Sequence, residues 1–232
     1  MPYHSAFERS GPVEVVEISA SLLAADYAQL GREVKRAESA GVDSFHFDMM
    51  DGHYVPNLAF TPQHLTALRS YTHLPFYTHL ELTNPDEVLS KFAALDTDMI
   101  SVQKDTLPNP ERTFEIIKKR GCKVGLGLSP VDSVENCASY FSQIDLLLIL
   151  GVYPGFGGQI MQPNTIGKIA LARKISTDLN ARITIAVDGG INHTNSAGLI
   201  NAGANCLIMG SALFQAGRIK QVIKQIRGPI EA

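Results

Sequence analysis

The sequence predicts an α/β protein that folds as one closed (β/α)8 barrel, the TIM barrel. Short apolar, β-branched runs alternate with stretches of helical period along the whole chain, and eight of each can be counted. Such alternation implies a parallel sheet, and eight units within about 215 residues match the size of a closed barrel. A doubly wound open sheet is the second choice, because it usually has fewer units and its GxGxxG turn is absent after the first run.

The predicted strands are runs of four to six residues rich in Val, Ile, Leu and Phe, which favour the pleated and buried environment of a sheet. A loop that contains Gly, Pro and Asn, at 51–57, follows the second of these runs. The strands are expected at residues 13–18, 44–49, 75–80, 99–103, 123–128, 146–150, 183–187 and 206–209.

The predicted helices show apolar residues at helical spacing and carry start and stop signals. Asp26 is a plausible N-cap of the first helix, Gly41 ends it, and Thr61-Pro62 opens the second. The helices are expected at residues 27–40, from 61 onward, and at 86–95, 110–120, 133–141, 165–179, 194–201 and 219–226.

Composition excludes several classes of protein. Apolar residues make up 45% of the chain and charged residues 19%, which argues against disorder. The formal net charge of −3 offers no electrostatic footprint for nucleic acid or an anionic membrane. The longest strongly apolar run, 146–150, is far short of the roughly 20 residues that span a bilayer. We therefore expect neither nucleic acid nor membrane as a partner.

The N-terminal residues predict the domain organisation, and the cysteines predict the cellular compartment. Residues 1–12 are polar and lack the apolar segment of a secretory signal, so we expect a mobile N-terminal extension before one catalytic domain at 13–232. Cys122, Cys137 and Cys206 form no CxxC motif and are odd in number. This usage favours a reducing, cytoplasmic setting. A symmetric homo-oligomer is the default expectation for a cytosolic barrel.

Polar residues gather at the strand ends where a barrel carries its chemistry. The second strand carries His46 and Asp48 two residues apart, so both point to the same face. His79 ends the third strand and Asp188 the seventh. A lone His-x-Asp is more often a simple polar pair, but two His and two Asp converging on one barrel mouth favour a divalent metal such as zinc or ferrous iron.

Glycines follow three neighbouring late strands. They occur in the segment 154–159, directly after Asp188, and at the end of the last strand. Backbone N–H groups in such loops commonly bind phosphate in these barrels, although the glycines could also serve only as tight turns. The candidate phosphate-binding residues are Gly155, Gly157, Gly158, Gly189, Gly190, Gly210 and Ser211.

Together these residues resemble the ribulose-phosphate 3-epimerase family. The motifs that carry the resemblance are SASLLAADY (19–27), HxDxMDGxxVPN (46–57), PGFGGQ (154–159), VDGG (187–190) and GSALF (210–214). The match extends over roughly residues 15–228, in order and nearly without gaps. The resemblance implies a TIM barrel of the ribulose-phosphate-binding type.

The resemblance also implies an activity and roles. It implies a metal-dependent isomerase that interconverts D-ribulose 5-phosphate and D-xylulose 5-phosphate through a cis-enediolate. One divalent ion, with Zn, Fe(II), Mn and Co as candidates, would be held by His46, Asp48, His79 and Asp188. Asp48 would remove the C3 proton and Asp188 would deliver one to the other face, with the roles swapped in reverse. Substrate contacts would include Ser21, His79 and Phe156 beside the phosphate-binding residues.

Four positions depart from the family pattern. Glu81 stands where the family usually has Met, and Gln103 where it has His. Leu150 and Gly151 stand where it has Met followed by Ser or Thr, while Met50 is kept. These residues are therefore candidates for substrate specificity, because they differ around a preserved metal and phosphate site.

Two alternatives stay open at this point. The first is a paralogous 3-epimerase for another ketose phosphate, such as allulose 6-phosphate or another hexulose 6-phosphate, or a tetrulose phosphate. The second is a catalytically silent barrel that binds a sugar phosphate, which would be expected to have lost a ligand or an aspartate. Neither a ligand nor an aspartate is lost here.

Overall fold

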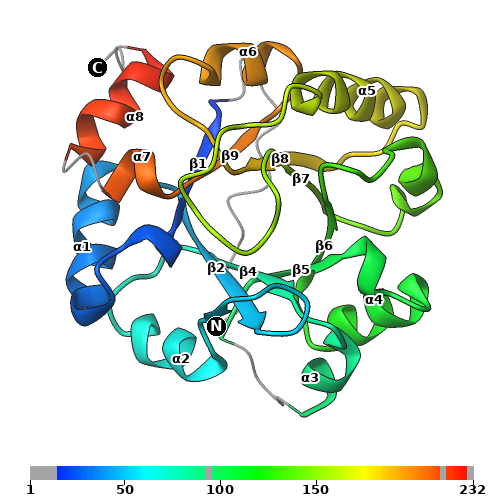
Figure 1. The fold of residues 1–232 in the computed structure, drawn as a ribbon, viewed down its shortest axis with the longest axis horizontal. Helices are drawn as coiled ribbons and strands as arrows, with labels where there is room; N and C mark the ends of the chain where they lie inside the picture. Colours follow the sequence, from blue (N-terminus) through cyan, green and yellow to red (C-terminus); the bar gives the residue numbers. More distant parts are fainter. Residues whose placement is uncertain (1–14, 92–95, 215–217, 229–232) are drawn as a thin grey trace.

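The computed structural model describes residues 15–91, 96–214 and 218–228. The expected extension at 1–12 lies outside the described residues. Within them the chain forms one ring of parallel strands surrounded by helices (Figure 1). The strand order is β1-β9-β8-β7-β6-β5-β4-β2, and a β1–β2 pairing closes the ring. The prediction of a closed (β/α)8 barrel is therefore confirmed.

The eight barrel strands are parallel and are paired in register. Their bounds are β1 Glu17–Ser21, β2 Ser44–Asp51, β4 Phe76–Glu81, β5 Met99–Gln103, β6 Lys123–Leu128, β7 Leu146–Leu150, β8 Thr184–Asp188 and β9 Cys206–Met209. A ninth strand, β3 (Leu58–Ala59), pairs antiparallel with the end of β2 and is not part of the ring. The sequence did not predict β3.

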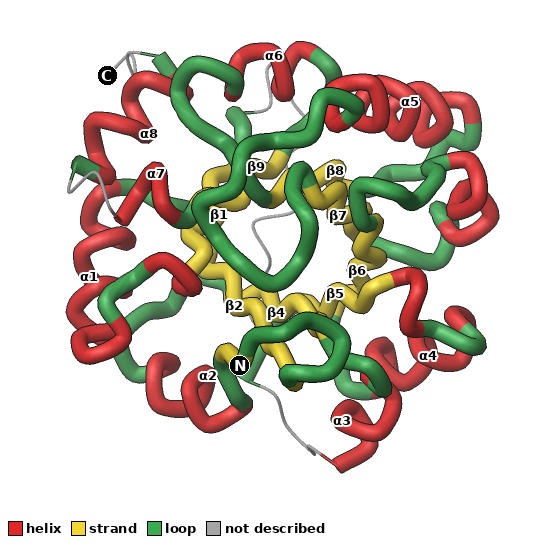
Figure 2. Tube along the Cα trace, in the orientation of Figure 1, coloured by secondary structure: helices red, strands yellow, loops and turns green. Residues whose placement is uncertain are grey.

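Helices cover the outside of the ring (Figure 2). They are α1 Leu30–Ala40, α2 Pro62–Arg69, α3 Pro85–Lys91, α4 Pro110–Lys119, α5 Thr165–Asp178, α6 Ser196–Asn201, α7 Ser211–Phe214 and α8 Ile219–Arg227. Short 3-10 turns lie at Leu22–Ala24, Tyr27–Gln29, Lys104–Thr106 and Glu135–Tyr140. Among these described segments, none has the length and apolar composition that crossing a bilayer requires.

Several predicted boundaries were wrong. The first strand begins at Glu17 rather than at 13, and Val15 is 67% exposed, outside the sheet. The segment expected to be a helix at 133–141 forms only a 3-10 turn, and 27–29 is also 3-10 rather than the first turn of α1. The short helix α7 was not predicted. The predicted cap at Asp26 is present, since its side chain accepts a hydrogen bond from the backbone of Ala28.

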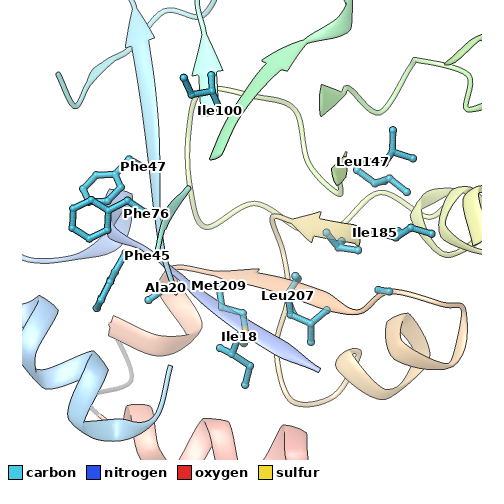
Figure 3. Packing of buried hydrophobic residues seen from close by; sticks show 14 of the residues in the cluster. Ile18, Ala20, Phe45, Phe47, Phe76, Ile100, Leu147, Ile185, Leu207 and Met209 are labelled. Carbon is cyan, nitrogen blue, oxygen red and sulfur yellow. The ribbon is translucent and has the colours of Figure 1, made fainter. Parts of the chain in front are cut away.

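Alternation along the strands produces two apolar layers. Outward-facing residues such as Phe45, Phe47 and Phe76 pack against the helices, and Phe47 meets Phe76 edge-on at 4.8 Å between ring centroids (Figure 3). Inward-facing residues, most of them on the late strands β7, β8 and β9, form a smaller apolar cluster that contains Tyr77, Met99, Leu146, Leu148, Leu150, Ala186, Cys206 and Ile208.

Most inward-facing residues of β1, β2, β4 and β5 are instead polar and buried. They are Ser19, Ser21, Ser44, His46, Asp48, His79, Glu81, Ser101 and Gln103. Polar groups are rarely buried without hydrogen bonds or a ligand, because desolvation costs several kcal/mol. The interior of the barrel therefore has an apolar half and a polar half, and the polar half is where chemistry is expected.

The same type of hydrogen bond recurs at the amino-terminal ends of the barrel strands. Asp43, Asp98, Asp145 and Asn205 each stand just before an alternate strand. Each accepts the backbone N–H of the neighbouring strand, at 2.7–2.8 Å. Asp43 also pairs with Arg227 of α8, whose guanidinium reaches the carbonyl of Gly41. The last helix is therefore tied to the first two strands.

We expect Asp43→Ala to lower the free energy of unfolding by about 1–3 kcal/mol, because the Ile18 N–H loses its acceptor and Arg227 loses its carboxylate partner, keeping only the carbonyls of Val16 and Gly41. Urea unfolding followed by circular dichroism measures the change. Asp178→Ala, which breaks an exposed pair with Lys174 in α5, is the control and should change stability by less than about 0.5 kcal/mol. Equal effects of the two substitutions would contradict this role of Asp43.

Candidate active site

Four predicted ligands come from three strands of the ring. His46 and Asp48 lie on β2, His79 on β4 and Asp188 at the end of β8. Asp48 and His79 are direct partners in the β2–β4 register, so their side chains leave the sheet side by side into the barrel. His46, Asp48 and His79 are almost fully buried.

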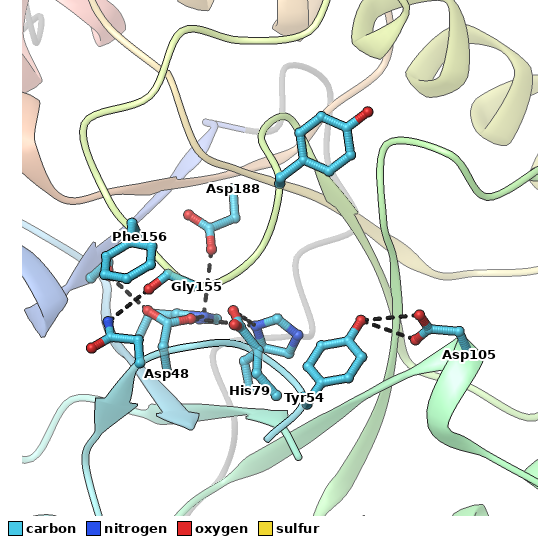
Figure 4. Close-up of polar contacts among 12 residues, drawn as sticks. Asp48, Tyr54, His79, Asp105, Gly155, Phe156 and Asp188 are labelled. Atoms are coloured by element: carbon cyan, nitrogen blue, oxygen red, sulfur yellow. Dashed lines mark hydrogen bonds and ion pairs between the residues drawn. The ribbon is translucent and has the colours of Figure 1, made fainter. Parts of the chain in front are cut away.

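The ligand atoms of these four residues converge. One donor atom from each lies within 4.8 Å of the other three. His46 Nε2 is 3.0 Å from Asp48 Oδ1 and 3.9 Å from Asp188 Oδ2, and His79 Nδ1 is 3.3 Å from Asp48 Oδ1. In Figure 4, Asp188 approaches Asp48 and His79 from the opposite side of the site. The predicted set is therefore brought together.

The chemistry of the donor set fits a divalent metal ion. Two imidazole nitrogens and two carboxylate oxygens suit zinc and other first-row divalent ions. Among the described residues, the ion pairs of Asp48 and Asp188 are with histidines, and no Lys or Arg neutralises either carboxylate. A buried pair of carboxylates without a strong cation is unfavourable, so a bound cation would complete the site.

Burial and mutual charge separate the pKa values of the two carboxyl groups in the site. Burial would raise the pKa of Asp48, but the neighbouring His46 and His79 outweigh it and hold that pKa well below its usual range. Burial and the charge of Asp48 raise the pKa of Asp188 to about 7. Two carboxyl groups with separated pKa values are suited to act as base and acid at neutral pH.

The pKa values of His46 and His79 shift in opposite directions. Burial lowers the pKa of His46, but Asp48 more than offsets this and the net pKa is raised. At His79, burial dominates over the hydrogen bond to Asp48 and lowers the pKa. His79 is therefore neutral near pH 7, as a metal ligand must be.

The four predicted ligands lie at one side of a pocket that is open to solvent. Asp48 and Asp188 line it, whereas His46 and His79 are buried behind its wall. The pocket wall also contains the predicted residues Ser21, Met50, Glu81, Leu150, Gly155, Phe156, Gly157, Gly158, Gly189, Gly190, Gly210 and Ser211. Ser21 Oγ donates to Asp48 Oδ2 at 3.1 Å and so helps to orient this carboxylate.

One end of the pocket is lined by backbone donors. In the described part of the chain, the N–H groups of Gly157, Gly158, Gly190 and Ser211 have no acceptor. Gly190 has a φ of +70°, and a Cβ atom there would lie 2.6 Å from the backbone N of Met161, so only glycine fits. Converging N–H groups of this kind form an anion site without any basic side chain.

The glycine-rich segment between β7 and α5 crosses in front of the ring of strands (Figure 1). Asn57 Nδ2 donates to the carbonyl of Gly155 at 2.7 Å, which ties this segment to the end of β2. Gln159 Nε2 donates to the carbonyls of Tyr153 and Phe156 and so stabilises the conformation of this segment. The sequence motif contained Asn57, but reasoning from residue types assigned it no role.

Two candidate specificity residues do not line the pocket. Gly151 packs under the β8 loop, since a Cβ atom there would lie 2.7 Å from the carbonyl oxygen of Gly189. Gln103 is buried at the end of β5, 1% exposed. Sequence reasoning also missed apolar wall residues, which are Leu23, Ala24, Val152, Tyr153, Pro154, Ile191, Ile208 and Met209. Residue type carries no signal for these, because the pocket wall joins loops that are distant in sequence.

Comparison with known proteins agrees with this site. The profile of the ribulose-phosphate 3 epimerase family matches residues 17–214. Ribulose-phosphate 3-epimerase of Bacillus subtilis (strain 168) is 37% identical over 215 residues, which cover 92% of this chain and 99% of that protein. The enzyme of the same name from Escherichia coli (strain K12) is 36% identical over 214 residues, covering 92% of this chain and 95% of the relative.

Solved structures with low identity share the fold. The tryptophan synthase α-subunit from Pyrococcus furiosus superposes with a TM-score of 0.69 at 16% identity, covering 93% of this chain and 99% of the other. Thiamine phosphate pyrophosphorylase from the same organism gives 0.61 at 14% identity, covering 92% and 95%. These likenesses concern the barrel alone, whereas the profile and the close relatives extend to the site motifs. The chain belongs to the ribulose-phosphate 3-epimerase family.

Proposed function

We propose that this protein interconverts D-ribulose 5-phosphate and D-xylulose 5-phosphate as a metal-dependent 3-epimerase. The observation that carries the proposal is the pair Asp48 and Asp188, which line one pocket beside an anion site made of backbone N–H groups. Relatives named ribulose-phosphate 3-epimerase, at 36–38% identity over most of the chain, support the same substrate.

The two aspartates divide the proton transfer. Asp48, held ionised by its histidine neighbours, removes the C3 proton, and the electron pair of that bond moves toward the C2 carbonyl to give an enediolate. Asp188, whose pKa is raised to about 7 by burial and by Asp48, delivers a proton to the other face of C3. Return of the electron pair restores the carbonyl with C3 inverted, and the reverse reaction exchanges the two roles.

The remaining residues bind and orient. The N–H groups at Gly157, Gly158, Gly190 and Ser211 hold the phosphate, and Ser21 keeps Asp48 aligned. A divalent ion bound by His46, Asp48, His79 and Asp188 would supply electrostatic stabilisation of the negative charge that develops on the substrate oxygens. Zn, Fe(II), Mn and Co are the candidate ions. The cytoplasmic setting and the homo-oligomer stay predictions.

Activity against a panel of ketose phosphates tests the proposal. We expect the highest kcat/KM with D-ribulose 5-phosphate, compared with allulose 6-phosphate and a tetrulose phosphate. A higher kcat/KM with a hexulose or tetrulose phosphate would replace the substrate but keep the reaction class. No turnover of any member by the metal-loaded protein would overturn the proposal in favour of a silent sugar-phosphate-binding barrel.

Glu81 is expected to contribute to substrate binding as a hydrogen-bond donor. It is 3% exposed, it lines the pocket, and its Oε2 has no partner in the described part of the chain. Burial, together with the charges of Asp48 and Asp188, raises the pKa of Glu81 to about 9, which favours the protonated carboxyl. It can therefore donate to a substrate oxygen.

The substitution Glu81→Met removes this hydrogen-bond donor. We expect kcat/KM for D-ribulose 5-phosphate to fall about 10- to 100-fold, because loss of one such bond costs about 1.5–3 kcal/mol. Glu81→Gln keeps a donor and should stay within about fivefold of the original enzyme. Steady-state kinetics near neutral pH measures both. Equal kcat/KM for the Met variant and the unaltered protein would show that Glu81 makes no contact in the reaction.

A further inference from the structure

The side chain of Gln103 is buried without hydrogen-bond partners. It ends β5, it is 1% exposed, and neither Oε1 nor Nε2 meets a partner at hydrogen-bond distance among the described residues. The same holds for Nε2 of His79 on the neighbouring strand β4. Buried amide and imidazole groups that stay unpaired cost about 1–3 kcal/mol each, and native proteins rarely tolerate them. Three such atoms on two neighbouring strands are therefore candidates to satisfy one another through a small side-chain adjustment.

The two side chains flank one small space. Gln103 is the direct partner of Gly127 in the β5–β6 register. A Cβ atom at Gly127 would lie 2.2 Å from Gln103 Oε1 and 3.3 Å from His79 Nε2. The missing side chain of Gly127 therefore leaves the room that the Gln103 amide fills, and the same position is in contact range of the His79 imidazole.

The other ring nitrogen of His79 faces the predicted metal ligands. Nδ1 is 3.3 Å from Asp48 Oδ1 and 3.4 Å from Glu81 Oε1. A neutral imidazole can offer a lone pair at Nδ1 only when its proton is on Nε2. Within the described residues, Gln103 Oε1 is the acceptor adjacent to that proton.

We propose that Gln103 is a positioning residue, whose Oε1 accepts the Nε2–H of His79 and thereby fixes the tautomer and ring orientation in which Nδ1 binds the metal. The proposal rests on the metal centre of the proposed function. Gly127 contributes to this arrangement, because any larger residue there would displace the amide of Gln103. Bonds from a metal-ligating histidine to a second acceptor commonly affect metal affinity about 10- to 100-fold.

The affinity of the metal-free protein for Zn²⁺ alone, measured by competition with a chelating dye, tests this role without reference to activity. We expect Gln103→Leu and Gln103→Met, which remove the acceptor, to weaken Zn²⁺ binding by about 10- to 100-fold. Gln103→Glu keeps an acceptor oxygen at the same chain length and should stay within about tenfold of the original affinity. Visible spectra of the Co²⁺-loaded forms should change for Leu and Met in parallel.

Ser101→Ala is the matched control. Ser101 is also buried on β5 and also faces a glycine of β6, since a Cβ atom at Gly125 would lie 2.0 Å from its Oγ. It should leave the Zn²⁺ affinity within about twofold, and circular dichroism checks the fold of every variant. Two acceptor-free variants of different shape keep the test available if one of them does not fold.

Unchanged Zn²⁺ affinity in the folded Leu or Met variant would overturn the proposal. If KM for D-ribulose 5-phosphate rises while Zn²⁺ affinity does not change, Gln103 contacts substrate and the positioning role is wrong. Failure of the proposed function is a separate result, because it would show as no epimerisation by the unaltered, metal-loaded protein whatever the affinities of the variants.

Discussion

Replacing either aspartate of the pocket by asparagine should reduce kcat for D-ribulose 5-phosphate about 100- to 10,000-fold, the usual contribution of a general acid or base. Asn can neither remove the C3 proton nor deliver one, but it keeps the size of Asp. Both residues line the pocket, within 4.8 Å of each other by one oxygen each, so each can reach the same carbon of a bound sugar. Stopped-flow or coupled assays at saturating substrate measure the loss.

The loss must be separated from loss of metal, because both residues are also ligands. Assays at saturating Zn²⁺, Mn²⁺ or Co²⁺, with the bound metal quantified, make this separation. We expect the Asp48→Asn and Asp188→Asn proteins to remain deficient when fully loaded. Asp178→Asn on the exposed face of α5 serves as the control and should keep full activity. Recovery of activity on metal loading alone would assign the aspartates a purely ligating role.

Removal of metal should reduce kcat for epimerisation by at least about 1,000-fold, since electrostatic stabilisation of developing charge by a metal is worth several kcal/mol. The ligand set places two carboxylates in a buried site with no Lys or Arg partner among the described residues. Dialysis against a chelator followed by stepwise addition of Zn²⁺, Fe²⁺, Mn²⁺ or Co²⁺ measures the dependence and ranks the ions.

Metal addition should also raise the unfolding temperature, because an ion that binds only the folded state stabilises it by mass action, by about 4 kcal/mol at a thousandfold excess over Kd. Asp188→Asn, which removes one ligand, should show a smaller rise than the unaltered protein. Full activity in protein shown to be free of metal would contradict the account of the site.

The order of strands and the convergence of His46, Asp48, His79 and Asp188 could be predicted because both depend on local signals. Runs such as 146–150 are apolar enough to be recognised alone, and β7 has the predicted bounds. His46 and Asp48 share a face through the two-residue period of a strand, and a parallel barrel brings all its carboxyl-terminal strand ends to one mouth. The site therefore followed from the fold with little further information.

Features that depend on pairing between distant segments could not be predicted. Val15 and Val16 have strand-like side chains, but β9 begins at Cys206 opposite Glu17, so no partner extends further back among the described residues. The strand β3 was missed for another reason, because it consists only of Leu58 and Ala59 and is too short to show a strand period in the sequence. Gln103 was recognised only as a departure from a family pattern, since its neighbours His79 and Gly127 lie on other strands.

The origin of the C3 hydrogen in the first product formed in D2O tests proton transfer by two aspartates. Transfer between two aspartates on opposite faces requires that the incoming hydrogen come from Asp188, which exchanges with solvent. We therefore predict that D-xylulose 5-phosphate formed in the initial phase carries one deuterium at C3 and none at other carbons, as measured by NMR or mass spectrometry. Product that retains the original hydrogen at C3 would contradict the two-aspartate account.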